Sequence, residues 1–254
     1  MAQQLSWVIG HHAVNAVIAV NPERAVALWV TMNSSNVAQQ SVVEQMRQLG
    51  LPVHAVDKRE LARRCGIEQN QGIALEAKPK QDGGDKELES FIKKLDGKKT
   101  PLLLILDQVQ DPHNFGACLR TADAAGADAV VVAKDNASPM TPVVQKVASG
   151  AAETMPIFRV TNLARAMEKL QQLGIWMIGT SDKAKHSIYQ ENLSGAVAIV
   201  MGAEGRGLRS LTEKKCDSLV SIPMAGSVVS SLNVSVATGV CLYEVVRQRV
   251  GDTS

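Results

Sequence analysis

The sequence has few aromatic residues and few cysteines, and the cysteines it has are not paired in a motif. Its 254 residues include three Trp, two Tyr, three Phe and four Cys. No C-x-x-C pair is present, which argues against a disulfide framework and against a zinc knuckle. We therefore expect reduced thiols that lie mostly in the core: Cys65, Cys118, Cys216 and Cys241.

Long apolar runs are also missing. No stretch of about 18 uncharged apolar residues is present, so no transmembrane helix is expected. The first residues, MAQQLSWVIGHHAVNAV, lack the basic flank and the small-residue cleavage site of a signal peptide. We expect a cytoplasmic protein with no membrane partner. An apolar content of 45% with 20% charged residues predicts a globular chain, and its length allows two domains.

The net charge of +2 does not by itself indicate a nucleic-acid-binding protein. The basic excess lies in residues 78–100, KPKQDGGDKELESFIKKLDGKKT, which contain seven Lys/Arg and five Asp/Glu. Scattered charge, a proline and adjacent glycines favour a solvated linker with a short helix at about 85–95, although its basic residues could also contact a phosphate backbone. This predicts a first domain at 1–77 and a second at 101–254.

The first domain reads as a small α/β unit. Three short apolar runs predict strands and three periodic segments predict helices; the strands are expected at 25–32, 52–56 and 72–77, and the helices at about 10–20, 36–49 and 58–64. The last helix carries Lys58, Arg59, Arg63 and Arg64 on about two turns. That basic face is either a solvated surface or a contact for an RNA backbone.

The second domain alternates near-continuous apolar strands with helices, which is typical of a parallel sheet covered on both faces. Strands are expected at 102–107, 128–133, 154–158, 175–180, 196–202 and 218–223, with helices at about 114–125, 140–149, 162–173, 208–215 and 232–249. In such sheets ligands bind beyond the carboxyl ends of the strands. Polar residues that directly follow a strand are therefore the candidates for a site.

The first such segment is DPHNFGACLRTADAAG, residues 111–126. It allows three interpretations: a metal site that uses Asp107, Asp111 and His113, a nucleophile relay, or a loop that positions an oxygen. The absence of a second His or Cys cluster disfavours the metal, and the absence of G-x-S-x-G disfavours the relay. Asn114 fits a helix cap. Arg120 follows among small and apolar residues, where a buried guanidinium would need an anion.

Two further strand ends carry polar residues next to glycine. GAEGRGL has an irregular glycine spacing that disfavours a dinucleotide-binding dehydrogenase; Glu204 adds a carboxylate there, and a plain helix-entry turn is an equal alternative. PMAGSVVSSLNVSVATG places Ser231 and Asn233 as caps of a long helix whose small residues suit a subunit interface. Together these segments describe a site with one cation, one carboxylate and several hydrogen-bond donors.

Taken in order, these residues resemble a known family. N-x-G-x-x-x-R (Asn114 to Arg120), G-x-E-G-x-G (Gly202 to Gly207), I-P-M-x-G (Ile222 to Gly226) and S-L-N-V-S-V-A (Ser231 to Ala237) resemble the motifs of the SpoU family of RNA 2′-O-ribose methyltransferases. The resemblance spans the second domain. Within the family, KVASGAAE, RVTNLARAM and NVSVATGVCLYEVVRQR are similar to bacterial members that methylate a guanosine ribose in 23S rRNA.

The resemblance implies a small ribosomal-protein-like RNA-binding domain followed by a parallel-sheet SPOUT domain with a deep trefoil knot. It implies S-adenosyl-L-methionine as cofactor and no metal, a homodimer with the C-terminal helix at its interface, and 23S rRNA or a precursor of the large ribosomal subunit as partner. Sparse aromatic residues then favour recognition of RNA by shape and backbone contacts. A tRNA ribose methyltransferase of the same family, or a catalytically idle RNA-binding homologue, is the alternative.

Site residues follow from the same resemblance. The catalytic group is expected at Asn114, Arg120, Glu204, Ser231 and Asn233. The cofactor contacts are expected at Thr180, Gly202, Ile222, Met224 and Leu232, largely through backbone atoms. Because arginine stays protonated, we assign Arg120 to charge stabilisation at the 2′ oxygen rather than to proton removal. Residues 227–230 form a loop one residue longer than the family pattern.

Overall fold

The computed structural model describes residues 5–32, 36–95, 97–226, 228 and 231–251. The chain forms two compact units. Unit 1 comprises Met1–Gln81 and Met140–Thr154, and unit 2 comprises Asp82–Pro139 and Met155–Ser254. This division differs from the expected one, because a segment of the expected second domain packs with the first.

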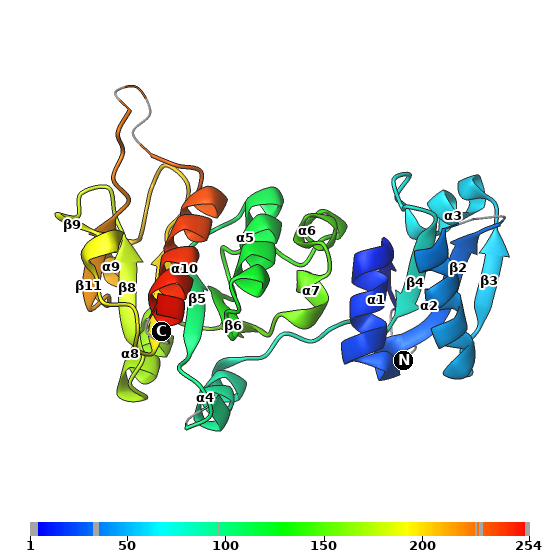
Figure 1. The fold of residues 1–254 in the computed structure, drawn as a ribbon, viewed down its shortest axis with the longest axis horizontal. Helices are drawn as coiled ribbons and strands as arrows, with labels where there is room; N and C mark the ends of the chain where they lie inside the picture. The colour runs from blue at the N-terminus through cyan, green and yellow to red at the C-terminus, as the bar shows by residue number, and fades with distance from the viewer. Residues whose placement is uncertain (1–4, 33–35, 96, 227, 229–230, 252–254) are drawn as a thin grey trace. The chain divides into compact units, whose positions relative to one another are not determined.

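Unit 1 is built on a four-stranded mixed sheet in the order β1-β4-β2-β3 (Figure 1). Its strands are β1 (Ser6–Ile9), β2 (Ala25–Thr31), β3 (Val53–Val56) and β4 (Ile73–Ala77), and its helices include α1 (His11–Val20), α2 (Val37–Gln48) and α3 (Lys58–Cys65). Side chains of α1 and α2 bury one cluster with the sheet, and Leu61 and Cys65 of α3 bury another. The three expected strands and three expected helices are confirmed, and the short β1 was not foreseen.

The segment that joins unit 1 from the second half of the chain contains α6 (Pro142–Ala148) and α7 (Ala151–Thr154). Glu153 is almost fully buried and pairs with Arg24 at 2.5 Å, and Lys80 Nζ donates to the Ala152 carbonyl at 2.7 Å. Gly150 adopts a φ of +99° and approaches the His12 carbonyl so closely that an added Cβ would lie 3.2 Å from it. These contacts hold α7 against α1.

Unit 2 contains a seven-stranded sheet in the order β7-β6-β5-β10-β8-β11-β9, and every strand pair is parallel. Its strands are β5 (Leu102–Leu106), β6 (Ala129–Ala133), β7 (Ile157–Val160), β8 (Trp176–Thr180), β9 (His186–Ser187), β10 (Val197–Met201) and β11 (Ser218–Ser221). The expected parallel sheet is confirmed. The carboxyl ends of β5, β10, β8 and β11 therefore lie side by side along one edge.

Helices cover the sheet of unit 2. These are α4 (Asp85–Leu95), α5 (Pro112–Ala124), α8 (Leu163–Gln172), α9 (Ser210–Glu213) and α10 (Val234–Gly251). Leu88 and Ile92 of α4 are buried in one core cluster with α8 and the sheet, so this part of residues 78–100 is packed rather than a solvated linker. Helices α5 and α10 contact each other, and the Cys118 sulfur lies 3.5 Å from the Thr238 hydroxyl.

The cysteines are free, as expected, and Cys65, Cys118 and Cys241 are buried while Cys216 is half-buried. Burial raises the pKa of the Cys118 thiol to about 11 and that of Cys241 to about 12. Since the thiolate is the reactive form, these two thiols are poor nucleophiles at neutral pH. They serve as packing residues of the α5 and α10 pair.

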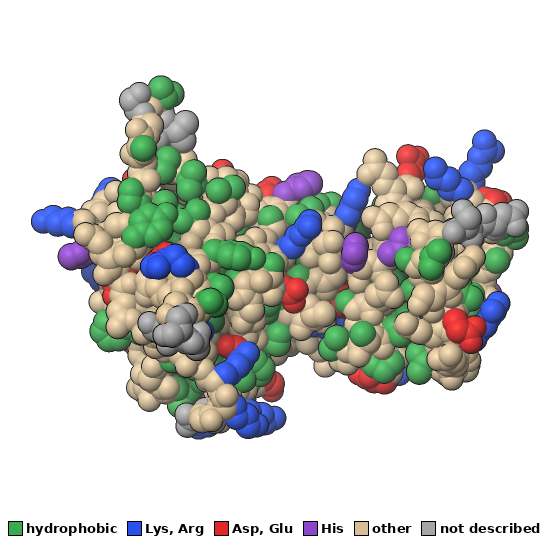
Figure 2. All heavy atoms as spheres, viewed as in Figure 1, with side chains coloured by type: hydrophobic (Ala, Val, Ile, Leu, Met, Phe, Trp, Pro, Cys, Tyr) green, Lys and Arg blue, Asp and Glu red, His purple; other side chains and the backbone are tan. Residues whose placement is uncertain are grey.

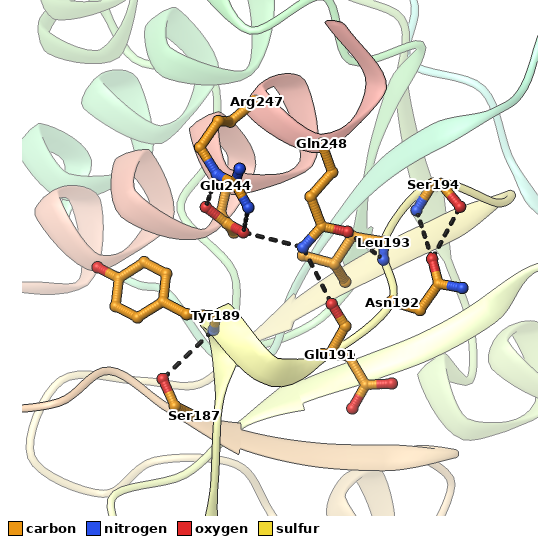
Figure 3. Close-up of polar contacts among 9 residues, drawn as sticks. All are labelled: Ser187, Tyr189, Glu191, Asn192, Leu193, Ser194, Glu244, Arg247 and Gln248. Carbon is orange, nitrogen blue, oxygen red and sulfur yellow. Dashed lines mark hydrogen bonds and ion pairs between the residues drawn. The ribbon is translucent and has the colours of Figure 1, made fainter. Parts of the chain in front are cut away.

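The side chain of Gln248 connects helix α10 to the loop after β9 by hydrogen bonds (Figure 3). Its Nε2 donates to the Glu191 carbonyl at 3.0 Å and to Glu244 at 2.8 Å, and its Oε1 accepts from the Leu193 backbone N–H at 2.8 Å. Glu244 also accepts two hydrogen bonds from Arg247, which hold the pKa of that carboxyl below its usual value. This network fixes the helix whose first turn enters the site described below.

We expect Gln248→Met to destabilise the protein by about 1–3 kcal/mol, because methionine keeps the volume of the side chain but leaves the Leu193 N–H and the Glu191 carbonyl without their partner. Denaturant unfolding would measure the change. Gln172→Met is the matched control, since Gln172 is exposed on α8 and its side chain has no hydrogen-bond partner among the described residues. Equal unfolding midpoints for Gln248→Met and Gln172→Met would mean that the hydrogen bonds of Gln248 do not stabilise the protein.

Candidate active site

The site begins where β5 ends and α5 starts. The cap of α5 is Asp111, whose Oδ1 accepts from the Asn114 backbone N–H at 2.7 Å, with Pro112 in the first turn. The expectation that Asn114 caps this helix is therefore wrong. Because the cap is supplied three residues earlier, the Asn114 side chain is left to project from the helix and contact other loops.

Glu204 is carried by a tight turn after β10. Ala203 and Gly207 exchange two backbone hydrogen bonds of 3.1 and 2.9 Å, and Gly205 and Gly207 have φ of +74° and +66°, which favour glycine. The turn is anchored at its far end by Asp107, which is fully buried and accepts from the Arg209 backbone N–H at 3.0 Å and from its Nε at 2.7 Å. Sequence reasoning missed this anchor.

The start of this turn tolerates no side chain. A Cβ on Gly202 would lie 2.1 Å from the Gly207 carbonyl carbon and 2.3 Å from the Leu208 nitrogen. We expect Gly202→Ala to displace the turn, to lower the stability by about 1–3 kcal/mol or more, as overpacking does, and to lower the activity of the site. Thermal unfolding and an activity assay check this, with Gly195→Ala as the matched control because its Cβ would meet nothing within 4 Å. Full activity of Gly202→Ala would show that the turn can move without loss.

Three expected catalytic residues meet at this edge of the sheet, and we call them the Asn114 cluster: Asn114, Glu204 and Asn233. Asn114 Nδ2 donates to Glu204 Oε2 at 3.0 Å. Asn233 Nδ2 donates to Asn114 Oδ1 at 2.9 Å and to Glu204 Oε1 at 3.4 Å. The Asn233 Oδ1 accepts from the backbone N–H of Ser235 at 2.9 Å, so Asn233 also caps α10 as expected. The carboxylate thus fixes the orientation of both amides.

Arg120 does not lie where the sequence argument placed it. Its side chain is exposed on α5 and has no hydrogen-bond or ion-pair partner among the described residues. The expectation of a buried guanidinium is wrong, because the neighbouring Cys118, Leu119 and Ala122 turn toward the core and leave Arg120 on the opposite side of the helix. The assignment of Arg120 to the catalytic group therefore depends on the family resemblance.

The expected cofactor residues follow three adjacent strands. Thr180 ends β8 and pairs in register with Val220 of β11, while Gly202 follows β10, the other neighbour of β8. Thr180 Oγ1 donates to the Val200 carbonyl at 3.3 Å. Ile222 and Met224 follow β11, and Leu232 directly precedes Asn233. Ser231 is exposed; residues 227, 229 and 230 of the longer loop lie outside the described residues.

The helix α3 of unit 1 keeps only part of its expected basic face. Arg63 and Arg64 both pair with Glu60, at 2.8 and 2.7 Å. The Arg64 guanidinium also lies 4.1 Å from the centre of the Trp29 ring. Lys58 and Arg59 are exposed. The two alternatives for this face, solvent and an RNA backbone, stay open.

Neither a metal cluster nor a membrane span is found in the part of the chain that the structure describes. No group of three His, Cys, Asp or Glu side chains there is placed to hold a metal ion. Asp107 and Asp111, the metal ligands considered from the sequence, instead anchor Arg209 and cap α5. No described helix is long and apolar enough to cross a membrane.

Two family models match the chain. Residues 101–243 match the SpoU rRNA Methylase family, and residues 7–83 match the family described as RNA 2′-O ribose methyltransferase substrate binding. Together the matches cover both the parallel-sheet half, with its Asn114 cluster, and the unit 1 sheet. The first match alone extends over more than half of the 254 residues.

Curated relatives are similar over nearly the full length. The chain is 49% identical over 247 residues to the 23S rRNA (guanosine-2′-O-)-methyltransferase RlmB of Pseudomonas putida, covering 97% of this chain and 98% of that protein. It is 49% identical over 245 residues to the protein of the same name from Haemophilus influenzae, covering 96% and 98%.

Solved structures share the fold. An RNA 2′-O ribose methyltransferase superposes with a TM-score of 0.78 at 24% identity and covers 98% of this chain and 90% of its own. The SpoU methyltransferase AviRb from Streptomyces viridochromogenes, solved in complex with AdoMet, superposes with a TM-score of 0.79 at 23% identity and covers 96% and 90%. These likenesses extend over both units of the chain.

Proposed function

The chain belongs to the SpoU rRNA methylase family, and on that premise we propose that it transfers a methyl group from S-adenosyl-L-methionine to the 2′ oxygen of a guanosine ribose in 23S rRNA. The substrate follows from the curated relatives, which carry that activity in their names at 49% identity over almost the whole chain. Within the structure, the observation that carries the proposal is the Asn114 cluster at the carboxyl edge of the parallel sheet.

The residues at the neighbouring strand ends fit a nucleoside cofactor. Among the described residues the backbone from Met224 to Gly226 makes no hydrogen bond, so its polar groups are open to a ligand. Ile222, Met224 and Leu232 add apolar side chains, and Thr180 and Gly202 line the two adjacent strand ends. We assign these five residues to the cofactor. S-adenosyl-L-methionine, when bound there, supplies an electrophilic methyl group.

The protein's task is to hold a weak nucleophile and to stabilise the charge that develops on it. As the bond between the 2′ oxygen and the methyl carbon forms, the methyl–sulfur bond would break with S-adenosyl-L-homocysteine as the leaving group, and the 2′ hydroxyl would give its proton to water. Negative charge grows on the 2′ oxygen during this step. Arg120 is assigned to that oxygen and the adjacent phosphate. Asn114, Glu204 and Asn233 orient the ribose, and Ser231 adds a hydroxyl beside them. A preorganised donor of this kind contributes about 2.7–4 kcal/mol to the transition state.

We propose that two copies associate through α5 and α10. Figure 2 shows hydrophobic side chains on the face of unit 2 over which these helices lie. Val236 and Tyr243 on α10 are 53% and 50% exposed, and a subunit interface through this helix would cover both side chains. Arg120 is exposed on α5, the partner helix of α10. In a dimer it would serve the Asn114 cluster of the other copy.

The trefoil knot and the cellular location are proposed on family membership. In the knot, the segment after β11 would thread under the turn after β10 before it continues as α10, so that the cofactor residues of both segments become one site. Unit 1 would hold the RNA, using exposed residues such as Lys58 and Arg59. A protein that acts on ribosomal RNA or on an assembling large subunit is placed in the cytoplasm.

The experiment that tests the function is methyl transfer from labelled S-adenosyl-L-methionine into unmodified 23S rRNA and into tRNA, with the methylated ribose mapped afterwards. We expect label at a single guanosine of 23S rRNA. Label in tRNA would identify the other substrate class of the family, and cofactor binding without transfer to either RNA would identify a catalytically idle homologue.

A further inference from the structure

A cavity of about 360 Å³ opens beside the Asn114 cluster, within the roughly 300–1,000 Å³ of typical ligand pockets. Asn114 and Glu204 form one side of it, and all its lining residues belong to unit 2. The others come from the loop after β5, the loop after β6, the turn after β10 and the first residue of α10: Gln108, Val109, Gln110, Asp111, Asn136, Ala203, Arg206 and Val234.

Four polar side chains in this lining are not used by the fold. They have no hydrogen-bond or ion-pair partner among the described residues: Gln108, Gln110, Asn136 and Arg206. Their character contrasts with the Asn114 cluster, in which each amide nitrogen already donates within the cluster. A cavity that combines free amides with a free guanidinium offers both donors and acceptors to a polar, planar ligand.

Two of these residues have a left-handed backbone. Gln108 and Asn136 have φ of +63° and +60°, a conformation that asparagine tolerates and that glutamine adopts at a cost of about 1–3 kcal/mol. Of the four described non-glycine residues with positive φ, these two line the cavity. Residues held in this conformation cluster at active sites and ligand-binding sites.

The loops that carry Gln108 and Asn136 are also hydrogen-bonded to each other. The Ser138 backbone N–H donates to the Val109 carbonyl at 3.0 Å, and Arg159 donates to the Ser138 carbonyl at 2.9 Å. Ser138 itself is buried. The loop after β6 is therefore held against the loop after β5, and the amides of Gln108 and Asn136 enter the cavity from a rigid frame.

We propose that this cavity binds the guanine base of the nucleotide whose ribose is methylated, and that Arg206, Gln108 and Asn136 read the edges of that base. The inference rests on the proposed function, since it requires a guanosine substrate. A base placed here has its ribose next to Asn114 and Glu204, which form the wall of the same cavity.

Guanine presents two acceptors, O6 and N7, on one edge and N–H donors at N1 and N2 on another. An arginine fork donates to O6 and N7 together, which is the commonest specific contact to guanine. Adenine carries an amino group in place of O6, so the same arginine would face a donor and disfavour it. The amide oxygens of Gln108 and Asn136 accept from N1–H and N2–H.

The first test replaces the arginine. RNA transcripts of the 23S region that the wild type methylates are prepared with guanosine, inosine or adenosine at the target position, and single-turnover methylation is measured for each. We expect Arg206→Ala to lower the rate on guanosine by about 10- to 100-fold and to narrow the preference for guanosine over adenosine. Arg165→Ala is the matched control, because Arg165 is exposed on α8 and has no side-chain partner among the described residues.

Arg206→Lys separates base reading from attraction to a phosphate. Lysine keeps the charge but lacks the planar fork, so the preference for guanosine should fall as in Arg206→Ala. A lysine variant with wild-type rate and wild-type preference would overturn base reading by Arg206 and assign it to a phosphate. If the wild-type protein itself does not methylate a guanosine of 23S rRNA, the proposed function is refuted. That result is distinct from a lysine variant that methylates with wild-type preference, which refutes base reading by Arg206 alone.

The second test removes a side chain without disturbing its backbone. Glycine adopts the left-handed conformation of Gln108 freely, so Gln108→Gly should unfold at the same or higher denaturant concentration than the wild type. We expect the same variant to lose preference for guanosine over inosine, which lacks the N2 amino group. An unchanged preference would overturn the role of Gln108.

Discussion

Arg120→Ala is expected to lower methyl transfer by about 10²- to 10³-fold while cofactor binding is unchanged. Arg120 is exposed on α5 and has no partner in the described part of the chain, so its removal should leave folding intact. The loss would fall on the transition state, because the guanidinium acts on charge that appears only as the 2′ oxygen reacts. Single-turnover rates measure the loss of methyl transfer, and equilibrium binding of labelled S-adenosyl-L-methionine measures the affinity for the cofactor.

The control for this variant is Arg165→Ala, which removes an equally exposed arginine from unit 2. Turnover by Arg120→Ala at the rate of this control would refute the assignment. A parallel loss of cofactor binding would move Arg120 from charge stabilisation to the cofactor site.

Whether Arg120 serves its own copy or the other copy can be decided by mixing two variants, provided that each one alone lacks methyl transfer. Arg120→Ala and Glu204→Gln copies are denatured together, refolded and assayed. If Arg120 acts across the dimer, each mixed dimer has one site with both groups intact, and about a quarter of all sites in a random mixture recover. If it acts within its own copy, no site contains both groups and no activity returns.

The sequence predicted the parallel sheet of unit 2 because its strands are marked by short, continuous apolar runs. Runs such as Leu102–Leu106 and Val197–Met201 are apolar throughout, and several such short runs alternating with helical segments are typical of strands buried on both faces of a parallel sheet. Residues 140–154 pack with unit 1, which the sequence did not predict, because their helices are short and nothing in KVASGAAE shows that Glu153 pairs with Arg24. Such a contact between residues 129 positions apart has no local signature.

Sequence motifs predicted the residues of the site, and the structure corrects the environment expected for Asn114 and Arg120. Local rules put a cap at Asn114, but Asp111 competes for the same N–H groups and is better placed, since Pro112 favours the first helical turn. The burial of Arg120 was inferred from its apolar neighbours, and helical periodicity sends those neighbours to the opposite face. Gln108 and Asn136 could have been found only from their backbone conformations, which the sequence does not display.

A second large effect is expected for Asn114→Asp, a replacement of nearly the same shape. In the wild type Asn114 Nδ2 donates to Glu204 Oε2 at 3.0 Å. Aspartate has no donor for that contact and places a second carboxylate against the first, and two like charges about 4 Å apart repel by roughly 4 kcal/mol at an effective dielectric constant near 20. Glu204 should turn away, Asn233 should lose a partner, and methyl transfer should fall by about 10²- to 10³-fold.

The same substitution separates function from stability. Asn114 lies in the first turn of α5, where a negative charge gains about 0.3–1 kcal/mol from the helix dipole, and the exposed Glu204 is free to turn away from the new carboxylate. The free energy of unfolding in denaturant should therefore change far less than the rate of methyl transfer. Asn192→Asp is the matched control: Asn192 is exposed and uses only its Oδ1, which accepts from Ser194, so the acid adds the same charge without removing a donor. Near-normal turnover by Asn114→Asp would mean that the contact with Glu204 does not orient the substrate, and the reaction would then depend on Arg120 and on the groups that hold the base.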